Sequence, residues 1–241
     1  MMTRRINFTE LGTLLAIVTA VWLLWDTSII LPLKILVVFF HELSHGLMAI
    51  VTGGEIVRIE VVHQEGGLCV SRGGNRFLIL SAGYIGSLCW GGLLLVLAAR
   101  SNYDRSVSAA LGVLLIAATL WWVRPLASFG FVFGLFTGSA LLAVGYYLSH
   151  QVNDVLLKVL GLTSCLYALL DIKSDILDRP HLKSDAAMMA EEFGMPTQFW
   201  GLLWAVIAIG CAIVFLLVAG QRDPDYLTPD VPTSGGPMDS E

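Results

Sequence analysis

Long apolar stretches, each close to the length of a membrane-spanning helix, limit the possible folds of this chain more than any other feature. Such a helix needs roughly twenty mostly apolar residues, and about seven stretches approach that length. Hydrophobic residues make up 56% of the chain and charged ones only 14%. We therefore predict an all-α multi-pass membrane protein with about seven transmembrane helices. The predicted helices are residues 11–25, 29–52, 77–99, 107–123, 126–148, 155–177 and 199–219.

The amino end carries Arg4 and Arg5 ahead of the first apolar stretch. A signal peptide is disfavoured because no small-residue cleavage site follows the stretch, so we expect a retained helix. If the amino terminus is cytoplasmic and the helices alternate, most Lys and Arg residues of the loops, such as Arg58 and Lys183, fall on the inner side. We predict an integral protein of the cell (plasma) membrane with a cytoplasmic amino terminus and with Gln221 outside.

The helices leave little chain for a soluble domain, so residues 1–220 are expected to form a single transmembrane domain. Residues 221–241 are rich in Pro, Gly, Ser and acidic residues and have no apolar period, which predicts a disordered acidic tail. The net charge of -5, without clustered basic residues, argues against a nucleic-acid partner. A peptide or lipid partner is favoured.

Residues 53–75, between the second and third predicted helices, have the pattern of a small β-hairpin. Glycine pairs flank a segment, residues 56–61, that alternates like a strand, and residues 68–70 are expected to return as a second strand after the turn at Gly66 and Gly67. The alternative is an ordinary loop between two helices. We expect the hairpin to lie near the membrane surface.

The second apolar stretch contains the sequence VVFFHELSHGLMA, in which His41 and His45 are one helical turn apart with Glu42 beside them. Two imidazoles at this spacing reach a single metal ion, and the neighbouring carboxylate can accept a proton from a water on that metal. Chance occurrence is disfavoured because ionisable residues inside an apolar helix cost several kcal/mol unless they have a partner or a wet cavity. The motif predicts a zinc site.

A catalytic zinc ion usually has three protein ligands and an open position for water, so a third ligand must come from elsewhere in the chain. Asp171 is the first candidate because it follows an apolar run and should lie at the same depth as His45. Asp175 is the alternative, either as the ligand or as a hydrogen-bond acceptor for a ligand histidine. Both aspartates could instead solvate the end of their helix, and His63 is a reserve ligand.

The chain resembles the M50 family of intramembrane zinc metalloproteases, the site-2 protease clan, and in particular its M50B-like branch. The resemblance rests on HELSHGLMAIVTGGEIVRIEV, on LSAGYIGSLCWGG, and on LYALLDIKSDI with the later SDAAMMAEEFGMPTQFWGLLW. It implies a zinc ion bound by His41, His45 and an aspartate of a later helix, with Glu42 as the general base. It also implies transmembrane substrates unwound into an extended strand, and Gly83 and Ser87 near the scissile carbonyl.

These features predict a zinc metallopeptidase that hydrolyses peptide bonds of membrane-embedded or membrane-proximal proteins by means of zinc-activated water. Two alternatives remain open. A proteolytically inactive binder of the same fold would not need Glu42. An ion-coupled transporter would use the intramembrane His and Asp residues as a path, although such proteins often have matching halves and this chain shows no internal repeat.

Overall fold

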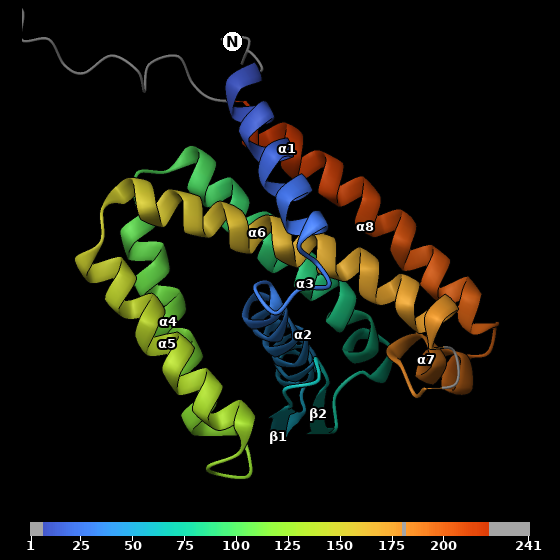
Figure 1. Cartoon of the computed structure of the whole chain (residues 1–241). Coiled ribbons are helices and arrows are strands. Elements are labelled where there is room, and N and C mark those ends of the chain that lie inside the picture. Colours follow the sequence, from blue (N-terminus) through green and yellow to red (C-terminus); the bar gives the residue numbers. More distant parts are fainter. Residues whose placement is uncertain (1–6, 180–181, 222–241) are drawn as a thin grey trace, which may run out of the picture.

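The computed structural model of the protein describes residues 7–179 and 182–221, which form a helical bundle with one small sheet (Figure 1). The predicted mostly helical architecture is confirmed. The elements in chain order are α1 (Phe8–Leu23), α2 (Leu31–Val51), β1 (Glu55–Val61), β2 (Gly67–Arg72), α3 (Arg76–Arg100), α4 (Asp104–Trp122), α5 (Phe129–Tyr147), α6 (His150–Lys173) with a π-helical turn η1 (Ser174–Asp178), α7 (Asp185–Phe193) and α8 (Thr197–Ala219).

Six of the described helices, rather than about seven, are long and apolar enough to cross a membrane. These are α2, α3, α4, α5, α6 with its π-helical turn, and α8, which together make this an integral multi-pass membrane protein. Helix α1 is apolar but has only 16 residues, short of the roughly twenty that a bilayer requires. The short helix α7 was not predicted. The predicted acidic tail lies outside the described residues except for Gln221.

The start of α1 lies beside the end of α8, because the backbone N–H of Asn7 donates a hydrogen bond of 2.9 Å to the carbonyl of Gly220. Lys158 on α6 reinforces this junction through an ion pair of 2.6 Å with Glu10 on α1. Seven alternating crossings would have put residues 7 and 220 on opposite faces of the membrane. The structure puts them together, so this part of the predicted topology is wrong.

The predicted hairpin is present as an antiparallel pair of strands, β1 and β2. A bulge at Val57 shifts the register, so that Val57 is exposed while Ile59 and Val61 are buried. The hairpin packs along α2, and its turn is held there by a 3.0 Å ion pair between Glu65 and the buried Lys34 of α2. The outer edge of β1 pairs with the connection between α4 and α5.

Helix α2 is the most buried of the candidate spans and packs against α3, α6 and both strands. Helices α3 and α6 pack closely because two glycines face each other: a Cβ on Gly161 would lie 2.8 Å from the carbonyl oxygen of Gly91. Helices α4 and α5 form a hairpin to one side of α2 (Figure 1). This arrangement puts α2, α3 and α6 around one buried site.

We expect Gly161→Val to destabilise the folded protein, because no side chain fits between α6 and the backbone of α3. Overpacking of this kind costs about 1–3 kcal/mol. The matched control is Gly210→Val on α8, where an added Cβ has no atom within 4 Å. Thermal unfolding in detergent should show a lower Tm for Gly161→Val only, and equal Tm values for the two variants would contradict the close packing of α3 and α6.

Candidate metal centre

Helix α2 presents His41, Glu42 and His45 to one cavity. The two imidazole rings lie one turn apart on the same face, with centroids 4.8 Å from each other. All three side chains are nearly buried, although most other buried residues of α2 are apolar. The predicted placement of the motif in an apolar helix is therefore confirmed, and such a cluster needs a polar or charged partner.

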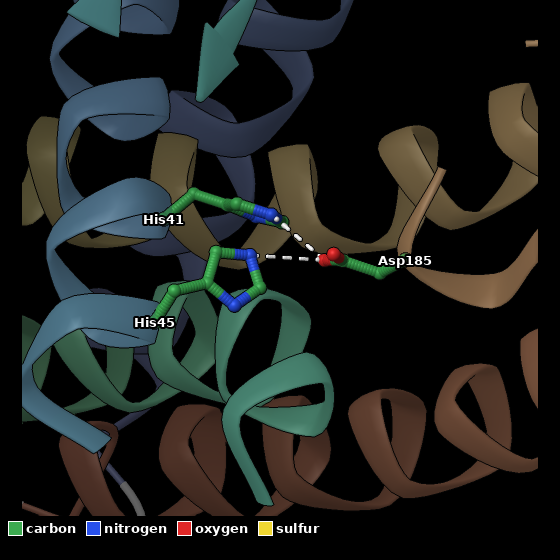
Figure 2. Close-up of side chains that lie close together, drawn as sticks. All are labelled: His41, His45 and Asp185. Carbon is green, nitrogen blue, oxygen red and sulfur yellow. Dashed lines mark hydrogen bonds and ion pairs between the residues drawn. The ribbon is translucent and has the colours of Figure 1, made fainter. Parts of the chain in front are cut away.

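The partner of both histidines is Asp185, the first residue of α7 (Figure 2). Its Oδ2 atom lies 3.1 Å from Nε2 of His41 and 3.1 Å from Nε2 of His45. The N-cap residue Ser184 begins α7 by accepting a hydrogen bond from the backbone N–H of Ala187, which fixes the position of Asp185 in the first turn. His41, His45 and Asp185 form the one group in the described part of the chain with the arrangement of metal ligands.

Hydrogen bonding indicates which ring nitrogen of His45 faces Asp185 without a proton. Its Nδ1 atom lies 2.6 Å from the carbonyl oxygen of Ile79, and since a carbonyl only accepts, Nδ1 must carry the hydrogen. In a neutral imidazole, Nε2 then directs its lone pair at the Asp185 carboxylate. Two electron-rich atoms at this distance require a positive charge between them, which either a proton or a metal ion can supply.

The donor atoms fit a metal such as zinc. Ligand nitrogen and oxygen atoms around tetrahedral zinc lie about 3.4 Å apart, given metal–ligand bonds of about 2.1 Å. The two Nε2–Oδ2 distances of 3.1 Å are close to this value, and all three atoms lie within 4.8 Å of one another. Two imidazoles and one carboxylate would leave a fourth position for water.

Two pKa shifts outside the membrane-spanning helices bear on this chemistry. Burial alone would raise the pKa of Asp185, but the two neighbouring histidines outweigh it and hold that pKa below its usual range. Asp185 therefore stays anionic at neutral pH. Burial raises the pKa of Cys69 on β2 to about 12, so this thiol is neutral at neutral pH.

A cavity of about 330 Å³ opens next to these side chains. Its walls come from α2, the hairpin, the start of α3, the end of α6 and the start of α7. Gly67 of β2 lies directly against Glu42, since a Cβ there would meet the carboxylate oxygen at 2.4 Å, and the backbone of Cys69 hydrogen-bonds Glu42. The hairpin thus covers the Glu42 side of the cavity.

The two aspartates predicted as third ligands line the same cavity but do not lie between the histidines. Oδ2 of Asp171 is 3.9 Å from Nδ1 of His41, the ring nitrogen that faces away from Asp185. Asp175 accepts a hydrogen bond from the hydroxyl of Tyr84. Both aspartates also lie near Arg179, at 3.7 and 3.5 Å respectively.

The two residues expected near the scissile carbonyl lie in different environments. Gly83 on α3 adjoins the centre, because a Cβ there would lie 2.4 Å from Nε2 of His41 and 2.6 Å from Oδ2 of Asp185. Ser87, one turn further along α3, is fully buried, and its carbonyl accepts a hydrogen bond from Ser164 of α6. It is not among the described residues that line the cavity.

The chain matches the family model described as Peptidase M50B-like over residues 14–215, and it therefore belongs to that family. The match contains α2, the hairpin, α3, α6 and α7, and so includes every residue of the candidate centre. Searches of curated proteins and of solved structures return no significant match. The family membership indicates a peptidase.

We expect Asp185→Ala to remove metal from the purified protein, because it deletes the carboxylate that both histidines face. Metal analysis of the detergent-solubilised wild type should give about one zinc ion per chain, and both this variant and the His41→Ala, His45→Ala double variant should give almost none. Asp178→Ala, at the end of α6 and paired with Lys173, is the control and should keep its zinc. Unchanged zinc in Asp185→Ala would remove Asp185 from the ligand set.

We also expect Gly83→Ala to abolish metal binding while the helices stay folded. The added methyl group would fall within 3 Å of both His41 Nε2 and Asp185 Oδ2, so it would push the two ligand atoms apart. Gly12→Ala on α1, where nothing lies within 4 Å of the new Cβ, is the matched control. Circular dichroism reports whether the helices stay folded, and zinc titration reports whether metal binding is lost. Tight zinc binding by Gly83→Ala would show that α3 does not limit the space at the centre.

Proposed function

We propose that residues 1–220 are an intramembrane zinc metalloendopeptidase that hydrolyses peptide bonds of membrane-embedded or membrane-proximal proteins. The observation that carries the proposal is the convergence of His41, His45 and Asp185 next to Glu42 in a cavity within the helical bundle. Membership of the M50B-like peptidase family supports it.

We assign zinc to His41, His45 and Asp185, in place of a set completed by Asp171 or Asp175. Asp185 is favoured because one of its oxygens is equally close to the Nε2 atoms of both histidines. Bound there, zinc would act as a Lewis acid and make a water molecule nucleophilic at neutral pH.

Glu42 is assigned as the general base. It lines the cavity together with the two histidines, and burial beneath β2 keeps bulk water away from it. A carboxylate in this position can take a proton from the attacking water and deliver it to the leaving amine. A binding protein of the same fold would not need such a group, and no separate observation favours an ion-coupled transporter.

The hairpin suggests how a substrate would be held. In an antiparallel ladder, hydrogen-bonded pairs alternate with pairs whose backbone groups point away from the partner strand. Val62 N–H donates to the carbonyl of Gly66, so these two residues form a hydrogen-bonded pair. Three positions along the ladder, Ile59 and Cys69 are therefore a pair whose backbone groups point outward. On the β1 side, the Ile59 carbonyl accepts from Arg124 N–H, which occupies that edge. The β2 edge runs past Glu42, which already takes a hydrogen bond from the backbone of Cys69, and the remaining outward groups of this edge are the ones we assign to an extended substrate segment added as a third strand.

We expect Glu42→Gln to keep zinc and fold but to lose cleavage, because the amide has the shape of the carboxylate without its proton affinity. General-base catalysis contributes about 10²- to 10⁴-fold, so cleavage should fall by at least the lower figure. The assay uses a panel of transmembrane peptides in liposomes with product identification by mass spectrometry.

Glu60→Gln is the matched control for this variant, because Glu60 lies on β1 and is paired with Arg58 rather than facing the cavity. It should cleave at the wild-type rate. Wild-type cleavage by Glu42→Gln would require a different base.

A further inference from the structure

A group of polar side chains at the end of α6 lies next to the candidate metal centre and is not used in the proposed reaction. Asp171, Asp175 and Arg179 line the cavity, and Tyr84 of α3 joins them by donating a hydrogen bond to Asp175. The end of α6 widens here into the π-helical turn η1, in which Arg179 N–H bonds to the carbonyl of Ser174 at 2.7 Å. Turns of this kind are rare and occur frequently at functional sites.

The two histidines differ in how their second ring nitrogen is held. His45 donates from Nδ1 to the carbonyl of Ile79, which fixes both the ring plane and the tautomer. For His41, Nε2 faces Asp185, and Nδ1 faces α6, where the nearest charged group is Asp171 with Oδ2 at 3.9 Å. His41 needs a comparable acceptor to present the same tautomer.

We propose that Asp171 is a positioning residue that accepts the Nδ1–H hydrogen bond of His41 and so orients this imidazole toward the metal. The inference rests on the proposed zinc site. The distance of 3.9 Å exceeds the roughly 3.2 Å of a good hydrogen bond, and a small rotation of either side chain closes the gap. A carboxylate acceptor fixes the tautomer and makes the ligand nitrogen more basic.

Arg179 lies close to the carboxylate of Asp171 and favours this orientation. Nη2 of Arg179 lies 3.7 Å from Oδ1 of Asp171 and 3.5 Å from Oδ1 of Asp175, so one cation serves both aspartates. Asp171 therefore presents one oxygen to Arg179 and the other to His41. Tyr84 anchors Asp175 from α3, and its ring also packs edge-on against His41.

The ring geometry of His41 separates this role from direct metal binding. The two nitrogens of an imidazole point in different directions, so a carboxylate that faces Nδ1 is not placed to share the ion bound at Nε2. Asp185 occupies the Nε2 side. Its depth in the membrane predicted Asp171 as a ligand. The same depth places its carboxylate on the Nδ1 side of His41, where it can accept a hydrogen bond from the ring.

The test measures zinc affinity and the cobalt(II) absorption spectrum of full-length protein in detergent, by competition with a chelator. Asp171→Ala should keep about one ion per chain but raise the Kd by about 10- to 100-fold, and the isosteric Asp171→Asn, which retains a neutral acceptor, should give a smaller increase. Asp178→Asn, in the π-helical turn that follows α6 and paired with Lys173, is the matched control and should leave the Kd unchanged. Thermal unfolding confirms that each variant is folded.

Each outcome bears on a different claim. A wild-type Kd in both Asp171 variants would overturn the positioning role and leave the proposed zinc site standing. Loss of the ion in Asp171→Ala together with its retention in Asp185→Ala would make Asp171 a ligand and would also overturn the role. A wild-type protein that binds no metal at all would remove the proposed function itself.

Discussion

The pairing of buried imidazoles with one buried carboxylate is the interaction on which the rest of this structure depends. Ionisable side chains in an apolar bundle are expensive unless they face each other or a cavity. His41 and His45 meet this condition through Asp185 (Figure 2), which comes from the short helix α7 beside the bundle (Figure 1). The glycine at position 83 lets α3 approach closely enough to close the other side. Polar contacts therefore decide how α2, α3 and α7 pack.

Local patterns in the sequence predicted those parts of the molecule that depend on neighbouring residues. The apolar stretches marked the candidate spans, and alternation between glycine pairs marked the hairpin. The spacing of His41 and His45 predicted their common face, because an α-helix repeats every 3.6 residues. Helix α1 was overcounted because its apolar stretch, residues 11–25, was accepted as a span although it is shorter than the roughly twenty residues that a bilayer requires.

The position of Asp185, the carboxylate that faces both histidines, depends on tertiary structure and could not be found by the same reasoning. Depth along a helix placed Asp171 near the histidines, but depth does not reveal which nitrogen of His41 it would face. Asp185 lies in a connection between two candidate spans, where an acidic residue usually meets water. The one local signal was Ser184 followed by Asp185 at the start of an amphipathic segment, which marks a helix amino end and says nothing about what lies opposite it.

The order in the chain of His41, His45 and Asp185 has a consequence for biosynthesis. His41 lies early in the chain and Asp185 lies 144 residues later, near the last described helix. At about 5–20 residues per second, a ribosome needs roughly 7–30 s to add this length. During that interval the nascent chain carries both imidazoles and Glu42 without the carboxylate that completes the group. In the protease proposed above, a centre divided in this way would be complete only after most of the described helices have been synthesised.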